Sequence, residues 1–243
     1  MSERPILEVE RLTIRYGRLT AVEDLSLAVP QGSVYALLGR NGSGKSSTVR
    51  CLLGQQRPTT GRTRLLGLDS WTERCTIMTS VGVVSETPNI PPETTADRLE
   101  RFMAKVSANW DRNKYASRLE RFGVPRQSRF DRLSKGQKAQ LSLTAAISTS
   151  PQLLILDDPT LGLDAVARRE LFEELVSELA DCGTTVFVTT HDLAGVESFA
   201  DQIGIIKDGH LRIDEELETI KGRFRRLEFS SDEENLRQAV AAE

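Results

Sequence analysis

A glycine-rich segment at residues 39–46 is the first stretch of the chain whose residue types and spacing could do chemistry. It matches the pattern G-x-x-x-x-G-K-[ST], in which glycines let successive backbone N–H groups turn inward around phosphate oxygens. Lys45 then directs a positive charge toward the β- and γ-phosphates, and the Ser46 hydroxyl is a ligand for Mg²⁺. The pattern predicts a nucleotide phosphate site made of Gly39, Arg40, Asn41, Gly42, Ser43, Gly44, Lys45, Ser46 and Ser47.

Two adjacent carboxylates follow a second apolar segment. Residues 153–156 form a continuous apolar run, which is typical of a strand buried on both faces, and Asp157 and Asp158 come directly after it. An acid at such a strand end can hold Mg²⁺ beside nucleotide phosphates through water. Because buried strands often end in aspartate, this interpretation depends on the phosphate loop upstream. With that loop present, we predict that Asp157 is a metal-side acid.

These residues need elements that bring them to one edge of a sheet. An apolar run at residues 34–38 predicts a buried strand that enters the glycine-rich loop, and residues 46–53 predict a helix that Gly54 ends. Further strands alternate with helices, which favours an α/β fold with a mostly parallel central sheet. The predicted elements are strands at 6–9, 12–16, 22–29, 81–84, 153–156, 185–190 and 202–207, a helix at 165–180 and a turn at 57–61.

Residues 133–137 read Leu-Ser-Lys-Gly-Gln, and they closely resemble the Leu-Ser-Gly-Gly-Gln signature of ATP-binding-cassette (ABC) ATPases. The resemblance covers residues 6–220, including the spacing of this segment before Asp157. It implies a P-loop NTPase core with an antiparallel β subdomain at the N-terminus, and ATP and Mg²⁺ as cofactors. It also implies that the signature residues face the γ-phosphate of ATP bound to a second subunit. These residues are Ser134, Lys135, Gly136 and Gln137.

Three further residues match ABC positions in order along the chain. Tyr16 matches the aromatic residue that stacks on adenine, Asp164 matches the loop that links two ATP sites across the dimer, and His191 matches the switch histidine that contacts the γ-phosphate. Other interpretations stay open. Tyr16 could be a core tyrosine, His191 could be an ordinary histidine at a strand end, and Asp164 could also be the N-cap of the next helix.

Asp158 departs from the family pattern. ABC ATPases usually carry glutamate there as the general base for the attacking water. Aspartate keeps the charge but is shorter by one methylene, so its carboxylate lies about 1.5 Å further back than that of glutamate. Since a misplacement of about 1 Å can cost on the order of 10²-fold in rate, we predict slow hydrolysis with near-normal ATP binding.

Glu86 is a second departure, because the family usually has glutamine after the strand at 81–84, where it contacts Mg²⁺ and the attacking water. Glu86 takes that place, or Ser85 if the alignment slips by one residue. A glutamate can still ligate Mg²⁺, but it adds negative charge near the γ-phosphate. The alternative interpretation is a solvated loop acid.

The resemblance also divides the chain. Residues 1–220 are predicted to form the ABC ATPase domain. Apolar residues at helical spacing predict three helices between about 92 and 150, and we interpret this segment as a helical insertion. Residues 221–243 are predicted to be a short extension, with a strand at 225–229 and a helix at 232–242.

Composition excludes several classes of protein. The chain has 243 residues, a net charge of −3 and a pI of about 5.7, so no basic field points to nucleic-acid binding. No apolar run approaches the roughly 18 residues that span a bilayer, and the N-terminus does not resemble a signal peptide. The three cysteines have neither paired nor metal-like spacing, so we expect reduced, partly buried thiols. These features predict a cytoplasmic location.

The segment from Trp110 to Gly123, followed by the signature, resembles the ATPase subunits of bacterial exporters whose membrane domain is a separate polypeptide. The implied function is ATP binding and hydrolysis by a homo- or heterodimer that drives export through a separate transmembrane permease, peripheral on the inner face of the cell membrane. Two alternatives remain: a soluble ABC ATPase without a transport role, and a mainly regulatory subunit with weak hydrolysis, which Asp158 favours.

Overall fold

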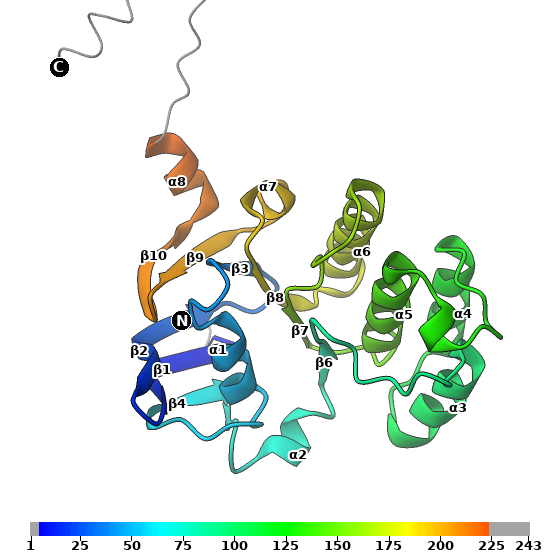
Figure 1. Ribbon diagram of the computed structural model, residues 1–243, viewed down its shortest axis with the longest axis horizontal. Coiled ribbons are helices and arrows are strands. Elements are labelled where there is room, and N and C mark those ends of the chain that lie inside the picture. The colour runs from blue at the N-terminus through cyan, green and yellow to red at the C-terminus, as the bar shows by residue number, and fades with distance from the viewer. Residues whose placement is uncertain (1–4, 224–243) are drawn as a thin grey trace, which may run out of the picture.

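A six-stranded sheet forms the centre of the protein in a computed structural model that describes residues 5–223, apart from the side chains of residues 165, 178–181 and 194 (Figure 1). Its strand order is β10-β9-β3-β8-β7-β6, and every pairing is parallel except that of β9 with β10. The predicted, mostly parallel α/β core is therefore confirmed. The strands are β3 (Val34–Leu38), β6 (Val81–Val84), β7 (Leu153–Asp157), β8 (Thr185–Thr190), β9 (Gln202–Lys207) and β10 (His210–Glu216).

The predicted antiparallel β subdomain is a four-stranded sheet with the order β2-β1-β4-β5. Its strands are β1 (Leu7–Tyr16), β2 (Leu19–Val29), β4 (Thr60–Leu65) and β5 (Leu68–Asp69). Two sequence predictions were wrong here. The strands predicted separately at 6–9 and 12–16 are one strand, β1. A register shift interrupts its pairing near Arg11, whose backbone is in a left-handed conformation (φ 44°). Thr60 and Gly61, predicted as a turn, begin β4, because pairing with β1 overrides their turn propensity.

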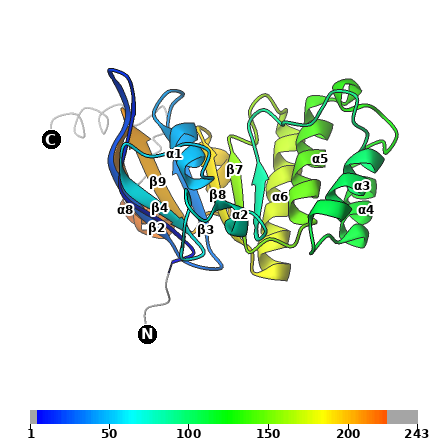
Figure 2. The same cartoon turned by 90° about the horizontal axis from the view of Figure 1, so that it is seen from below.

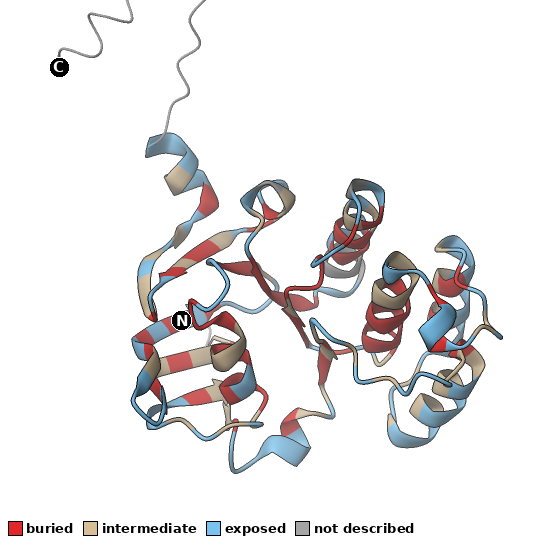
Figure 3. Ribbon diagram, in the orientation of Figure 1, coloured by how far each residue is buried: buried red, intermediate tan, exposed pale blue. Residues whose placement is uncertain are grey.

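The continuous apolar runs of the central strands are explained by two cores, one on each face of the sheet. Tyr35 and Leu37 of β3 face the antiparallel sheet, whereas Ala36 and Leu38 of the same strand face the helices on the other side. Figure 3 shows these strands buried along their length. Burying a large apolar side chain contributes about 1.5–3 kcal/mol, so both faces hold the strand that carries the glycine-rich loop.

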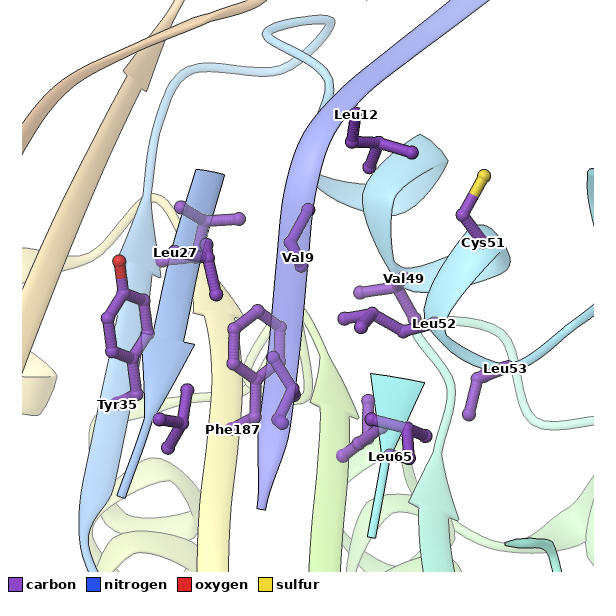
Figure 4. Packing of buried hydrophobic residues seen from close by; sticks show 14 of the residues in the cluster. Val9, Leu12, Leu27, Tyr35, Val49, Cys51, Leu52, Leu53, Leu65 and Phe187 are labelled. Atoms are coloured by element: carbon purple, nitrogen blue, oxygen red, sulfur yellow. The ribbon is translucent and has the colours of Figure 1, made fainter. Parts of the chain in front are cut away.

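The core between the two sheets is shown in Figure 4. The rings of Tyr35 and Phe187 stack with centroids 5.6 Å apart, and the Tyr35 hydroxyl donates a hydrogen bond to Asp214 at 2.9 Å. Cys51 belongs to this core, and burial raises the pKa of its thiol to about 11. Cys75 and Cys182 are exposed, so the expectation of partial burial was wrong for these two.

The helical insertion lies at the opposite end of the molecule from the antiparallel sheet in both views (Figures 1 and 2). It has its own apolar core around Tyr115 and Leu119. Its link to the rest of the protein includes Glu174 on α6 (Ala165–Cys182), which is fully buried and forms ion pairs with Arg118 and Arg121 of α4 (Arg112–Arg121). The helices of the insertion are α3 (Ala96–Val106), α4 (Arg112–Arg121), a 3₁₀ turn (Phe130–Arg132) and α5 (Lys135–Ile147).

The remaining helices in residues 5–223 lie outside the insertion. They are α1 (Lys45–Leu52), α2 (Arg74–Ile77), α6 (Ala165–Cys182), α7 (Leu193–Val196) and α8 (Leu217–Arg223). Helix α8 crosses the predicted boundary at residue 220, and the strand and helix predicted at 225–229 and 232–242 lie outside the described residues. Within 5–223, no helix combines the length and the apolar character needed to cross a bilayer.

Candidate functional site

The glycine-rich loop connects β3 to α1 as the sequence predicts. Gly39 donates its backbone N–H to the carbonyl of Thr190 at 3.2 Å, which ties the start of the loop to the end of β8. Gly44 has φ 114°, and a Cβ there would lie 2.6 Å from the carbonyl oxygen of Ala21. No other residue type fits that position, so the loop conformation and the entry into α1 both depend on glycine.

Lys45 is buried at the first position of α1, with 5% of its surface exposed. Its ammonium donates to the carbonyl of Gly39 at 2.7 Å and lies 3.9 Å from Oδ2 of Asp158. A buried ammonium needs partners of this kind to offset its desolvation. The loop thus holds a positive charge within its own turn, next to one of the two predicted acids.

Ser46 and Asp157 lie together although 111 residues separate them in sequence. The Ser46 hydroxyl donates to Asp157 Oδ1 at 3.1 Å. Hydroxyl and carboxylate oxygens are the hard donors that Mg²⁺ prefers, and Mg²⁺ usually takes one or two carboxylates, with phosphates and waters as its other ligands. Residues 5–223 contain no cluster of three or more acidic, histidine or cysteine side chains that could hold a metal by themselves. The donor set therefore fits Mg²⁺ bound together with a nucleotide.

Asp158 sits in a left-handed backbone conformation, with φ 46°. Its N–H donates to the carbonyl of Thr189 at 3.0 Å, and its carboxylate is buried between two basic groups. One is Lys45, and the other is Nδ1 of His191, at 3.1 Å from Asp158 Oδ1. The His191 side chain is 46% exposed, so it links the buried acid to the surface.

The glycine-rich loop and several predicted site residues from other parts of the chain line one cavity of about 420 Å³. Tyr16, Glu86 and Asp158 line it along with residues of the glycine-rich loop, among them Asn41, Gly42, Gly44, Lys45, Ser46 and Ser47. Ser85 lines a different groove, so the register that places Glu86 at this site agrees with the structure.

Tyr16 is 42% exposed, which rules out the alternative that it is a core tyrosine. Its hydroxyl donates to Oε1 of Gln56 at 2.5 Å and lies 3.3 Å from the hydroxyl oxygen of Ser47. These contacts hold the ring at the mouth of the cavity, where a flat base could stack on it.

The signature residues line a separate cavity of about 310 Å³. Its walls include Ser134, Lys135, Gly136, Gln137, Gly162 and Asp164, and none of its lining residues also lines the first cavity. Asp164 accepts a hydrogen bond from the N–H of Ala167 at 2.9 Å, so the predicted N-cap of α6 is present. Within one chain, the structure therefore brings the predicted residues together as two groups rather than one.

Ser134 caps α5 through a reciprocal pair of hydrogen bonds. Its hydroxyl accepts from the N–H of Gln137, and the Gln137 side chain accepts from the N–H of Ser134, each at 3.1 Å. A Cβ on Gly136 would lie 3.1 Å from that of Ala167. In the described part of the chain, no residue forms an ion pair or hydrogen bond with the ammonium of Lys135, which lies against Gly162.

Two residues near the first cavity were missed by sequence reasoning. The Thr189 hydroxyl donates to Asp157 Oδ1 at 2.7 Å, and Gln56 holds Tyr16. The only sequence signal for Thr189 is a polar residue near the end of a predicted buried strand. Gln56 carried no signal, because a surface glutamine after a helix is ordinary.

Comparison with known proteins identifies the family. The ABC transporter family matches residues 22–161. The bacitracin transport ATP-binding protein BcrA of Enterococcus faecalis is 36% identical over 208 residues, 85% of this chain and 68% of that protein. BcrA of Bacillus licheniformis is 32% identical over 233 residues, 95% of this chain and 76% of that protein. A solved ATP-binding subunit of an ABC transporter superposes with a TM-score of 0.80 at 28% identity, covering 96% of this chain and 98% of that one. This chain therefore belongs to the ABC transporter family, as one of its ATP-binding subunits.

Proposed function

We propose that this chain hydrolyses ATP as one half of a dimer that drives export through a separate transmembrane permease, peripheral on the inner face of the cell membrane. The observation that carries the proposal is the division of its predicted site residues between two cavities. A chain with two incomplete halves needs a second subunit to complete each ATP site. The export role is supported by the relatives named for bacitracin transport, and the permease would select the substrate.

In the first cavity, Tyr16 would stack on the base, and the N–H groups of the glycine-rich loop and Lys45 would bind the phosphates. Ser46 and Asp157 would hold Mg²⁺, with Glu86 at its edge; the ion neutralises charge on the phosphate oxygens when bound. Asp158 would accept a proton from the attacking water. His191, at 3.1 Å from Asp158, would orient that carboxylate and reach toward the γ-phosphate.

The second cavity would serve ATP held by the partner subunit. Ser134 offers a hydroxyl at the start of α5, where the helix dipole favours negative charge, and Gly136 would offer its backbone N–H to a phosphate. Asp164 would link the two sites, while its carboxylate also caps α6. Residues 1–220 would act as the ATPase domain and 221–243 as an extension.

Lys135 adds a charge where the family signature has glycine. Since none of the described side chains forms an ion pair with its ammonium, we expect it to attract the phosphates of ATP bound to the partner. A unit charge about 4 Å away contributes roughly 1 kcal/mol in water, so Lys135→Gln should raise the ATP concentration that drives dimerisation about fivefold. Size-exclusion chromatography across an ATP series measures this. Lys105→Gln, an exposed lysine on α3, is the control, and equal curves for both variants would contradict the role.

The permease is expected to dock on a groove of about 820 Å³ between the central sheet and the helical insertion, near Glu86. Phe102 and Val106 of α3 line it, and each is 60% exposed. An aromatic side chain of this kind is a typical anchor for a partner segment. A cytoplasmic segment of the permease with an apolar face would cover these side chains.

Phe102→Asp should reduce recovery of the membrane partner on the order of tenfold, because the charge would be desolvated in the interface. Pull-down of the tagged chain from its native membrane, with identification of the retained protein, measures this. Val176→Asp, at an exposed apolar residue outside the groove and both site cavities, should leave recovery unchanged. If Phe102→Asp still retains the partner, or if the chain recovers no hydrophobic protein, the docking proposal fails.

A further inference from the structure

Thr189 lies beside both acids of the first cavity. It is the second-last residue of β8, is fully buried, and pairs directly with Asp157 of β7 in the parallel register. Neighbouring residues in register project from the same face of a sheet, so the Thr189 side chain points where the Asp157 carboxylate points. An aliphatic side chain would fill this buried position equally well, so packing alone does not account for a hydroxyl here.

That hydroxyl contacts both acids at once. It donates to Asp157 Oδ1 at 2.7 Å and accepts from the N–H of Asp158 at 3.1 Å. A hydrogen bond to a carboxylate is stronger than one between neutral groups. Asp157 Oδ1 also accepts from Ser46, so both hydroxyls hold the same oxygen, and none of the described groups donates to Oδ2.

The Thr189 hydroxyl also bears on the direction in which the Asp158 carboxylate points. With φ 46°, its backbone is in a region that non-glycine residues rarely occupy, and its N–H is shared between the hydroxyl and the carbonyl of Thr189. This turn directs the carboxylate toward Lys45 and His191. A short acid cannot reach by changing rotamer as a glutamate can, so its placement is set by the backbone.

We propose that Thr189 is a positioning residue whose hydroxyl sets the orientation of the Asp157 carboxylate toward Mg²⁺ and the backbone of Asp158 toward the attacking water. This inference rests on the proposed roles of the two acids. Partners that orient metal ligands in this way typically change metal affinity or activity 10–100-fold when removed.

The test compares Thr189→Val, which removes the hydroxyl and keeps the shape, with Thr189→Ser, which keeps the hydroxyl. In the valine variant the N–H of Asp158 retains the Thr189 carbonyl, so the fold should survive. Thr184→Val is the matched control, because its hydroxyl is also buried and donates to the carbonyl of Pro151, away from both cavities. The measurement is binding of a fluorescent ATP analogue to the full chain across a Mg²⁺ series, and without Mg²⁺.

We expect Thr189→Val to raise the half-saturating Mg²⁺ concentration about tenfold and to lower kcat, with binding in the absence of Mg²⁺ unchanged. Thr189→Ser should lie within about twofold of the wild type, and Thr184→Val should match it. The proposal is overturned if Thr189→Val leaves the Mg²⁺ dependence unchanged, or if it weakens binding equally with and without Mg²⁺. A wild-type chain that binds no nucleotide would overturn the proposed function as well.

Discussion

Asp158→Glu is expected to raise the rate of ATP hydrolysis on the order of 10²-fold, with little change in ATP affinity. The longer side chain would restore the reach that aspartate lacks, and a misplacement of about 1 Å costs roughly that factor. The carboxylate borders the cavity of about 420 Å³, which leaves room for one more methylene. Hydrolysis and nucleotide binding of the wild type and the variant, measured in parallel, check this expectation.

The same substitution is expected to cost stability through the backbone. Asp158 has φ 46°, a conformation that aspartate tolerates better than glutamate, and the strain of a left-handed residue is roughly 1–2 kcal/mol. Strain in the folded state lowers stability without by itself changing the reach of the side chain. We therefore expect Asp158→Glu to hydrolyse ATP faster while its Tm falls by a few degrees, about 2–4 °C for each kcal/mol lost.

Asp158→Asn is the control, because it keeps the shape and removes the charge that Lys45 and His191 contact. It should abolish the residual hydrolysis of the wild type. If glutamate gives no gain and asparagine abolishes a brisk wild-type rate, then Asp158 is a fully competent base and the prediction of slow hydrolysis is wrong. That result would also remove the reason for considering a mainly regulatory subunit.

The elements predicted best from sequence were the central strands. The bounds predicted for β3, β6, β8 and β9 agree with the structure, because strands buried on both faces require unbroken apolar runs. Strand β4 was missed, because its sequence Thr-Gly-Arg-Thr-Arg-Leu has only two buried side chains. Strand β10 has only half-buried and exposed positions and is rich in acids, so its pairing with β9 is a tertiary effect.

The same holds for the site residues. Those that belong to a local sequence pattern could be predicted, whereas those placed by tertiary structure could not. The glycine-rich loop is a local pattern, since its glycines and Lys45 all lie within residues 39–45, and the sequence alone predicted its position. Thr189 could not be found in this way, because its role depends on the register that sets it beside Asp157. The separation of the signature from the phosphate loop is likewise a property of the fold, because α1 packs in the core on one face of the central sheet and α5 packs in the core on the other face.

The proposed division of each ATP site between two subunits makes a strong prediction for mixed subunits. Lys45→Ala removes the charge of the phosphate loop, and Gly136→Asp adds an acid where the partner's phosphates would approach. Each variant alone should lose hydrolysis on the order of 10²-fold, the usual cost of losing one charge-stabilising group. In a mixed dimer both lesions fall in the same site, and the other site is intact.

Mixing the two inactive variants in equal amounts should therefore restore roughly a quarter of the wild-type rate, because random pairing places about half of the subunits in mixed dimers with one intact site each. Hydrolysis is measured before and after mixing at constant total subunit concentration. Gly222→Asp, at a position with open space on α8, controls for the added acid and should be active alone. If each site were complete within one chain, every subunit in the mixture would still carry a lesion in its own site. The rate would then stay at the level of the separate variants, and the composite site would be excluded.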